Sequence, residues 1–176
     1  MPLPCNFTLK DGRTALIRQA NPGDAEGLLA HVNEITAEGI FLQTERVDKS
    51  AAEEMEWISG FDGLSKLLIV AEVDHRLVGS ADIRRGPQVK NAHVAELGIA
   101  LSKGARGQGL GRAIIEAMID WARSVGIRKL FLGVFHTNER AIALYRVLGF
   151  EDEGRLRGQV ILEGQPADLV LMSRWI

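Results

Sequence analysis

Cysteine is almost absent from this chain of 176 residues, since Cys5 is the only one. A single thiol forms no disulfide within the chain and cannot build a zinc site from several cysteines. The four histidines show no spacing typical of metal ligands, so we expect no metal centre. Chains without disulfides are usual in reducing compartments, and we therefore expect a cytoplasmic protein.

Long hydrophobic runs and an excess of charge of one sign are absent as well. No apolar stretch approaches the ~18 residues of a transmembrane helix. Residues 1–10 lack the charged leader and apolar stretch of a signal peptide. The 21 basic and 23 acidic side chains give a net charge of −2, whereas nucleic-acid-binding proteins are usually strongly basic. We therefore expect no membrane and no nucleic acid among the partners.

Glycine is the residue type in excess, with 19 residues, and it is concentrated at expected turns and in one loop. Hydrophobic residues make up 46% of the chain and charged residues 25%, which is typical of globular proteins. The length suits one domain, and residues 1–176 contain no repeat or linker. The sequence therefore predicts a single domain over residues 1–176.

Strand-like and helix-like segments alternate along the chain, which favours an α/β architecture. Residues 67–73 form a nearly continuous apolar run, typical of a central strand. Residues 110–125 form the clearest helix, because their apolar positions recur at helical spacing. Further helices are expected at 24–37, 50–59 and 138–148, and further strands at 14–20, 77–84, 93–101, 130–135, 155–162 and 167–174.

The most informative segment is residues 103–112, KGARGQGLGR, between an expected strand and the clearest helix. Glycines let the backbone approach a ligand and turn its amides toward an anion. The helix start adds unpaired N–H groups and a partial positive charge. Lys103, Arg106 and Arg112 add cationic side chains. These features coincide, so they predict a phosphate or pyrophosphate site rather than a tight turn with incidental glycines.

Two common phosphate-binding motifs do not fit this segment. The Walker motif requires Gly-Lys-Ser/Thr, and the chain has Gly111, Arg112 and Ala113. In the dinucleotide motif the third glycine would fall at Arg112, and Phe131 stands about 20 residues further on, where an acid is needed. A nucleotide-binding module is therefore disfavoured.

Two motifs in this order resemble those of the GNAT N-acetyltransferases. Residues 106–111, RGQGLG, match the family's acyl-CoA loop, Gln/Arg-x-x-Gly-x-Gly/Ala. Residues 138–150, NERAIALYRVLGF, are similar to its motif Asn-x-x-Ala-x-x-x-Tyr-x-x-x-Gly-Phe. The resemblance implies a single-domain α/β fold. Its mixed, mostly antiparallel sheet of about seven strands would be splayed at the centre and flanked by about four helices.

The resemblance also implies a reaction. An acetyl group would pass from acetyl-CoA, the co-substrate, to a primary amine by direct attack. The acceptor would be a small molecule, such as an amino acid, a polyamine or a drug-like amine. The alternatives are acetylation of a protein N-terminus and a CoA-binding sensor without turnover. A homodimer is compatible with the resemblance.

Cofactor contacts and a general acid follow from the same resemblance. Tyr145, the only tyrosine, matches the family's general acid, which protonates the CoA sulfur. Its helical spacing with Ile142 and Leu148 alone favours core packing, whereas the motif favours the acid. Asn138 would cap its helix and contact the cofactor. The expected cofactor contacts are Ile99, Ala100, Leu101, Arg106, Gly107, Gln108, Gly109, Leu110, Gly111, Arg112, Asn138, Ala141 and Tyr145.

A proton acceptor for the attacking amine is a further requirement. Strand alternation places Glu96, Gly98 and Ala100 on one face of the expected strand. A carboxylate in a central strand is costly unless it is solvated or paired. Glu96 is therefore either the base, acting through water, or a structural partner. His93 and His136 are further candidates, because an imidazole titrates near neutral pH.

The resemblance places the acceptor pocket between the first two helices and the last hairpin. Glutamates in that region would favour cationic amines, although a solvated helix face is the more common role of such residues. Aromatic residues there would either line an apolar pocket or belong to the core. The glutamates are Glu34, Glu38, Glu53, Glu54 and Glu56, and the aromatic residues are Phe41, Trp57 and Phe61.

Overall fold

A computed structural model describes residues 3–42 and 46–176. Strands and helices alternate, as the sequence predicts, and short 3-10 turns precede α1 (Pro22–Asp24) and α3 (Lys103–Ala105). No helix within the described ranges is long and apolar enough to cross a membrane. The elements are β1 (Cys5–Thr8), β2 (Thr14–Gln19), α1 (Ala25–Thr36), α2 (Ala51–Ser59), β3 (Lys66–Val73), β4 (Arg76–Arg85), β5 (Val94–Leu101), α3 (Leu110–Ser124), β6 (Lys129–Phe135), α4 (Glu139–Val147), β7 (Glu151–Leu162) and β8 (Gln165–Trp175).

The described strands form one sheet in the order β1-β2-β3-β4-β5-β6-β8-β7. All neighbours are antiparallel except β5 and β6, which are parallel. The expected mixed, mostly antiparallel sheet with four helices is confirmed. The structure adds β1, an edge strand of four residues that is too short to stand out in the sequence. It also begins β7 at Glu151, because pairing with β8 starts there and continues past a register shift.

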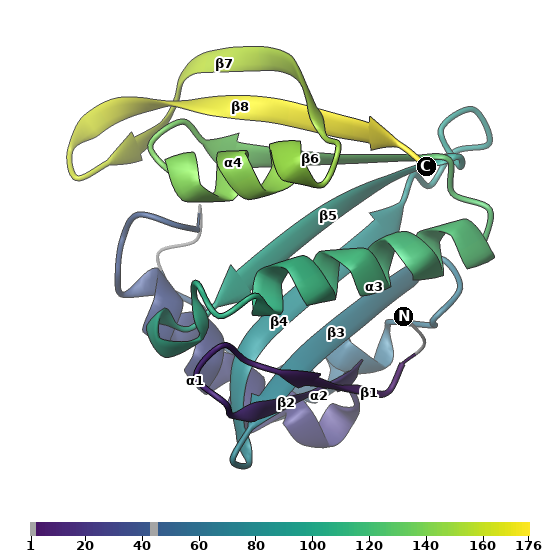
Figure 1. Cartoon of the computed structure of the whole chain (residues 1–176), viewed down its shortest axis with the longest axis vertical. Helices are drawn as coiled ribbons and strands as arrows, with labels where there is room; N and C mark the ends of the chain where they lie inside the picture. The colour runs from purple at the N-terminus through teal and green to yellow at the C-terminus, as the bar shows by residue number, and fades with distance from the viewer. Residues whose placement is uncertain (1–2, 43–45) are drawn as a thin grey trace.

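The sheet parts between its two parallel strands. Residues 94–96 of β5 pair with residues 129–131 of β6, and the pairing then stops, although both strands continue. Beyond that point β6 pairs only with β8. Figure 1 shows the gap widening toward the starts of α3 and α4. The expected splay is therefore confirmed, and the ends of both strands open onto one space.

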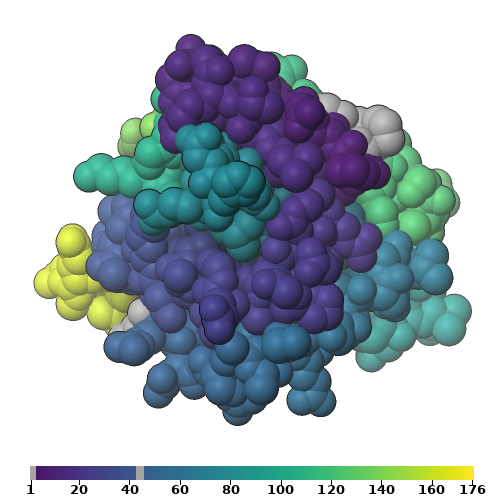
Figure 2. Space-filling view, turned by 90° about the horizontal axis from the view of Figure 1, so that it is seen from below, coloured from purple at the N-terminus to yellow at the C-terminus, as the bar shows by residue number. Residues whose placement is uncertain are grey.

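Helices cover both faces of the sheet. α3 and α4 pack on the face toward the viewer in Figure 1 and contribute Ile114, Met118 and Ile142 to the main core. α1 and α2 pack on the other face over β3, where Leu68 and Val70 belong to a second cluster. Figure 2 shows that the end of the molecule seen from below consists largely of the N-terminal half, with the C-terminal hairpin visible only at its edge.

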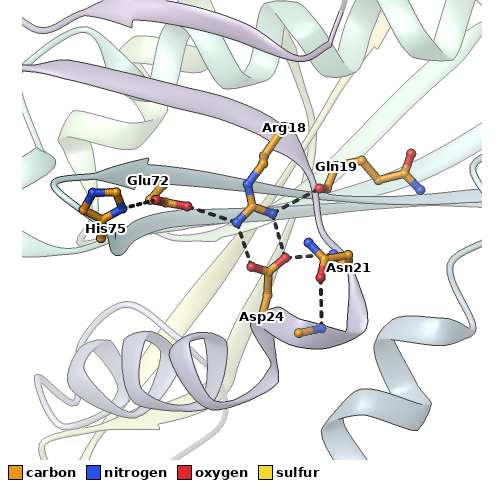
Figure 3. A network of polar contacts seen from close by, with 7 residues as sticks. Arg18, Gln19, Asn21, Asp24, Glu72 and His75 are labelled. Atoms are coloured by element: carbon orange, nitrogen blue, oxygen red, sulfur yellow. Dashed lines mark hydrogen bonds and ion pairs between the residues drawn. The ribbon is translucent and has the colours of Figure 1, made fainter.

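An ion-pair network joins the start of α1 to the sheet (Figure 3). Arg18 on β2 donates to both carboxylate oxygens of Asp24, at 2.7 Å each, and to Glu72 on β3 at 3.0 Å. Asp24 also accepts the backbone N–H of Asn21 at 2.8 Å. Burial opposes ionisation of Asp24, but the hydrogen bonds from Arg18 and Asn21 outweigh it and lower the pKa of the carboxyl. The charged network therefore fixes α1 over β2 and β3.

Candidate active site

The splay between β5 and β6 opens a cleft of about 1270 Å³. The end of β5 and the glycine loop line one side, and the start of α4 lines the other. The segment after α1 and the tip of the β7–β8 hairpin border the same cleft. The structure brings most of the predicted cofactor residues together here, namely Ile99, Ala100, Leu101, Arg106, Gly107, Gly109, Gly111, Arg112, Asn138, Ala141 and Tyr145.

Two predicted cofactor residues do not line the cleft. The side chain of Leu110 is fully buried in the main core. The carbonyl of Gln108 accepts the backbone N–H of Lys10 at 3.3 Å, which ties the glycine loop to the β1–β2 turn. Lys10 itself lines the cleft, and the sequence analysis missed it because the pairing of β1 with β2 brings it there.

The glycine loop contains three glycines with distinct structural requirements. Gly107 and Gly109 have φ values of 79° and 89°, in the left-handed region that favours glycine. A Cβ at Gly109 would lie 3.1 Å from Phe7, and one at Gly111 would lie 3.2 Å from Leu101. By contrast, a Cβ at Gly104 would meet nothing within 4 Å. The backbone of the loop therefore requires glycine at 107, 109 and 111, where side chains of the same chain pack closely, and not at 104.

The cationic side chains available to a ligand are not the set expected from the sequence. Arg106 pairs with Glu38, and Arg112 pairs with Glu116 at 2.8 Å, so the charges of both arginines are largely compensated. Lys10 and Lys103 line the cleft without an ion pair in the described part of the chain, as does Arg140. The guanidinium of Arg140 lies directly against Gly107. Arg140, two residues after Asn138 in the second motif, was not among the residues expected from the sequence.

Tyr145 belongs both to the main core and to the cleft. It is 7% exposed, and its ring lies 5.7 Å from that of Phe150 between centroids. Burial raises the pKa of Tyr145 to about 12. The phenol therefore keeps its proton across the neutral range and can act as a donor inside the cleft. Core packing and a place at the site, which the sequence presented as alternatives, coexist.

Asn138 both caps a helix and lines the cleft. It is the N-cap of α4, and its Oδ1 accepts the backbone N–H of Ala141 at 3.2 Å. This confirms the predicted cap. The same residue lines the cleft.

Glu96 lies at the last paired position before the sheet parts, opposite Phe131. Its neighbours Ala95 and Leu97 are buried on the α3 face, whereas Glu96 is exposed on the other face. Glu96 does not line the cleft, although it lies at the base of the splay. The predicted alternation of side chains along β5 is therefore confirmed, and the side chain is solvated.

A second carboxyl group, which the sequence analysis missed, stands near Glu96. Asp82 on β4 pairs in register with Gly98. Burial raises the pKa of Asp82, Arg84 opposes this effect, and the negative charge of Glu96 adds to it. Polar residues at alternate positions of the otherwise apolar β4 were the available indication in the sequence.

The two histidine candidates differ in position. His93 stacks on Trp175, with ring centroids 6.1 Å apart, and does not line the cleft. His136 lines the cleft, and its Nδ1 accepts the backbone N–H of Asp168 at 3.0 Å. The same Nδ1 lies 3.4 Å from the carbonyl oxygen of Asp168, so the backbone of β8 fixes the orientation of the ring at the cleft.

A buried histidine joins α1 to the end of β5. Nδ1 of His31 lies 3.0 Å from Oγ of Ser102, and the residue is 2% exposed. Burial lowers the pKa of His31 to about 4. Across residues 3–42 and 46–176, no three His, Cys, Asp or Glu side chains gather into a potential metal site.

The outer part of the cleft contains none of the glutamates that were expected to make it acidic. Ile35, Ile40, Phe41 and Leu42 line it, together with the hairpin residues Leu162, Glu163, Gln165 and Pro166. None of the five predicted glutamates lines the cleft: Glu38 pairs with Arg106, Glu54 pairs with Lys49, and Glu53 caps α2. Among the three aromatic candidates, Phe41 lines the cleft, whereas Trp57 and Phe61 pack against each other in the second cluster, under α1 and α2.

Comparison with known proteins agrees with this arrangement. The model of the acetyltransferase (GNAT) family matches residues 34–150. YwnH of Bacillus subtilis (strain 168), provisionally named a phosphinothricin acetyltransferase, is 29% identical over 162 residues, which cover 90% of this chain and 97% of YwnH.

Solved structures give the same result. A GNAT-family acetyltransferase from Streptococcus pneumoniae has a TM-score of 0.87 at 28% identity and covers 92% of this chain and 99% of its own. A GNAT-superfamily phosphinothricin acetyltransferase (Pat) from Sinorhizobium meliloti, in complex with AcCoA, has a TM-score of 0.83 at 25% identity. That match covers 92% of this chain and 88% of the other.

Proposed function

The chain belongs to the acetyltransferase (GNAT) family, and we propose that it transfers the acetyl group of acetyl-CoA to the primary amine of a small molecule. The observation that carries this proposal is the convergence of two motifs in one cleft. The glycine loop follows β5 and Tyr145 lies on α4, which follows β6, and both line the cleft that opens where β5 and β6 part. The acetyl-CoA complex of the Sinorhizobium relative supports the choice of donor.

The residues of the cleft fit acetyl-CoA in charge and shape. The backbone amides of residues 107–111 would hold the pyrophosphate at the start of α3, where N–H groups are unpaired. Lys103 and Arg140 would supply the compensating charge. The edge of β5 beyond Glu96, which β6 leaves unpaired, would hold the pantetheine through Ile99 and Leu101.

The proposed reaction requires one bond to form and one to break. Acetyl-CoA supplies a thioester; the amine nitrogen bonds to its carbonyl carbon, and the carbon–sulfur bond breaks. The nitrogen loses a proton and the sulfur gains one, so a protein group is useful at each end. Tyr145, which lines the cleft with a protonated phenol, would donate a proton to the sulfur. Glu96, at the base of the splay, would accept the amine proton through water.

Calorimetry of acetyl-CoA binding tests the loop assignment. Gly109→Val should weaken binding by roughly tenfold or more, because a side chain strains the left-handed backbone and displaces Phe7. Gly104→Val is the matched control in the same loop, since its side chain would enter open space, and it should bind like the wild type. Urea denaturation of each variant verifies that it is folded. Equal affinities for all three proteins would refute the assignment.

A further inference from the structure

The side chain of Arg106 is directed away from phosphate binding. Its Nε donates to the carbonyl of Leu101 at 2.8 Å, and its two terminal nitrogens donate to the two carboxylate oxygens of Glu38, one at 2.8 Å. The guanidinium carbon also lies 4.2 Å from the ring centroid of Phe41. Arg106 thus contacts the end of β5, an acid and an aromatic face at once.

This arrangement is strong enough to define the local structure. A forked arginine–carboxylate pair fixes both side chains in orientation, and a cation over a ring adds attraction. The side chains of Arg106 and Glu38 are only 19% and 27% exposed, so solvent screens the pair weakly. The hydrogen bonds from Arg106 lower the pKa of Glu38, which is therefore charged at neutral pH. Binding of a phosphate by Arg106 would require this pair to open.

The pair connects the two halves of the cleft. Arg106 lies in the glycine loop, whereas Glu38 and Phe41 lie just after α1. Phe41 and its neighbours Ile40 and Leu42 line the outer cleft. The guanidinium therefore holds an apolar wall in place from the end of β5, and it compensates the acid that would otherwise attract a cation.

We propose that Glu38 and Arg106 are positioning residues that hold Phe41 as the apolar wall of the acceptor pocket, and so select amines with an apolar side chain over amines with a charged one. This inference rests on the proposed acetyl transfer. The pair acts on the acceptor and leaves acetyl-CoA binding unchanged. An apolar pocket discriminates against a charged substituent because that group loses its hydration without gaining a partner.

Two matched pairs of acceptors test the selectivity. Leucine and aspartate have similar shapes but differ in the charge of the side chain, and isoamylamine and β-alanine are the same pair without the α-carboxylate. The wild type should favour the apolar member of whichever pair it acetylates, by roughly tenfold or more in kcat/KM. Glu38→Gln should reduce this preference at least threefold by raising KM for the apolar member, with kcat and the acetyl-CoA dissociation constant within twofold.

Glu116→Gln is the matched control. It removes the partner of Arg112, another arginine of the cleft, but that pair lies within α3 and is more exposed. This variant should keep the selectivity of the wild type. Phe41→Ser should reproduce the loss seen in Glu38→Gln, whereas Phe41→Leu should keep most of the preference. Equal behaviour of the Glu38 and Glu116 variants, or a parallel loss of acetyl-CoA affinity in Glu38→Gln, would overturn the proposal.

Hydrogen exchange separates this proposal from the proposed function. Amides of residues 37–42 should exchange at least threefold faster in Glu38→Gln than in the wild type, and unchanged in Glu116→Gln, whether or not an acceptor is turned over. Unchanged exchange in Glu38→Gln would overturn the positioning role. A wild type that binds acetyl-CoA but acetylates neither pair would overturn the selectivity for apolar acceptors.

Discussion

Tyr145 illustrates how one residue can belong both to the core and to the cleft. Its ring is packed against Phe150 in the main core, which fixes the side chain. The same burial that stabilises the ring keeps the phenol protonated, since it raises the pKa to about 12. In the proposed reaction, this fixed phenol would donate its proton to the sulfur.

Glu96 is the residue whose replacement tests the proton acceptor. Glu96→Gln should lower kcat/KM by about 10²-fold and alter the acidic limb of the pH–rate profile, because the variant has no carboxylate to accept the proton. Kinetics over a range of pH provide the measurement. Asp82→Asn alters the neighbouring carboxyl on β4 and should retain that limb. A Glu96→Gln profile identical to that of the wild type excludes Glu96 as the base.

At the scale of the elements, the sequence did not predict the polar contacts between the α1 region and the end of β5. His31 and Ser102 are 71 residues apart, and Glu38 and Arg106 are 68 apart. Local patterns predicted α1, β5 and the glycine loop, because apolar periodicity and glycine spacing are short-range features. They do not specify which polar side chains meet across the sheet. For this reason Arg106 was expected to contribute charge to the cofactor, whereas it is compensated by Glu38.

The link through His31 predicts a pH dependence of stability. The pKa of His31 is about 4 in the folded chain and near 6.5 in the unfolded one. As pH falls below about 6.5, the unfolded chain binds a proton that the folded chain does not, so the free energy of unfolding decreases. The loss should reach about 2 kcal/mol at pH 5.

Urea denaturation at pH 7 and pH 5 measures this loss. His31→Gln should show a smaller difference between the two pH values than the wild type, whatever its stability at pH 7. His75→Gln, which replaces a fully exposed histidine, should behave like the wild type. An unchanged difference in His31→Gln would show that its ring does not carry the effect.

The whole molecule consists of two sheet segments that share only a short parallel junction. Each of the two sequence motifs lies on one wall of the cleft, and the splayed fold was implied by the family resemblance that these motifs carry. The outer part of the cleft was harder to predict, because Phe41 and the hairpin residues Leu162 and Pro166 meet there only through tertiary structure. The sequence suggested an acidic acceptor region, but none of those five glutamates lines the cleft, and Glu38, Glu53 and Glu54 are used in ion pairs or a helix cap.

Mass spectrometry of products tests the central claim, acetyl transfer within this cleft, most directly. The wild type is incubated with acetyl-CoA and a panel of small primary amines, and N-acetylated product and free CoA are quantified together. The account predicts both in equal amounts, and a rate about 10²-fold lower for Tyr145→Phe with acetyl-CoA affinity within about twofold of the wild type. A wild type that binds acetyl-CoA and acetylates no amine, or a Tyr145→Phe variant as fast as the wild type, would contradict it.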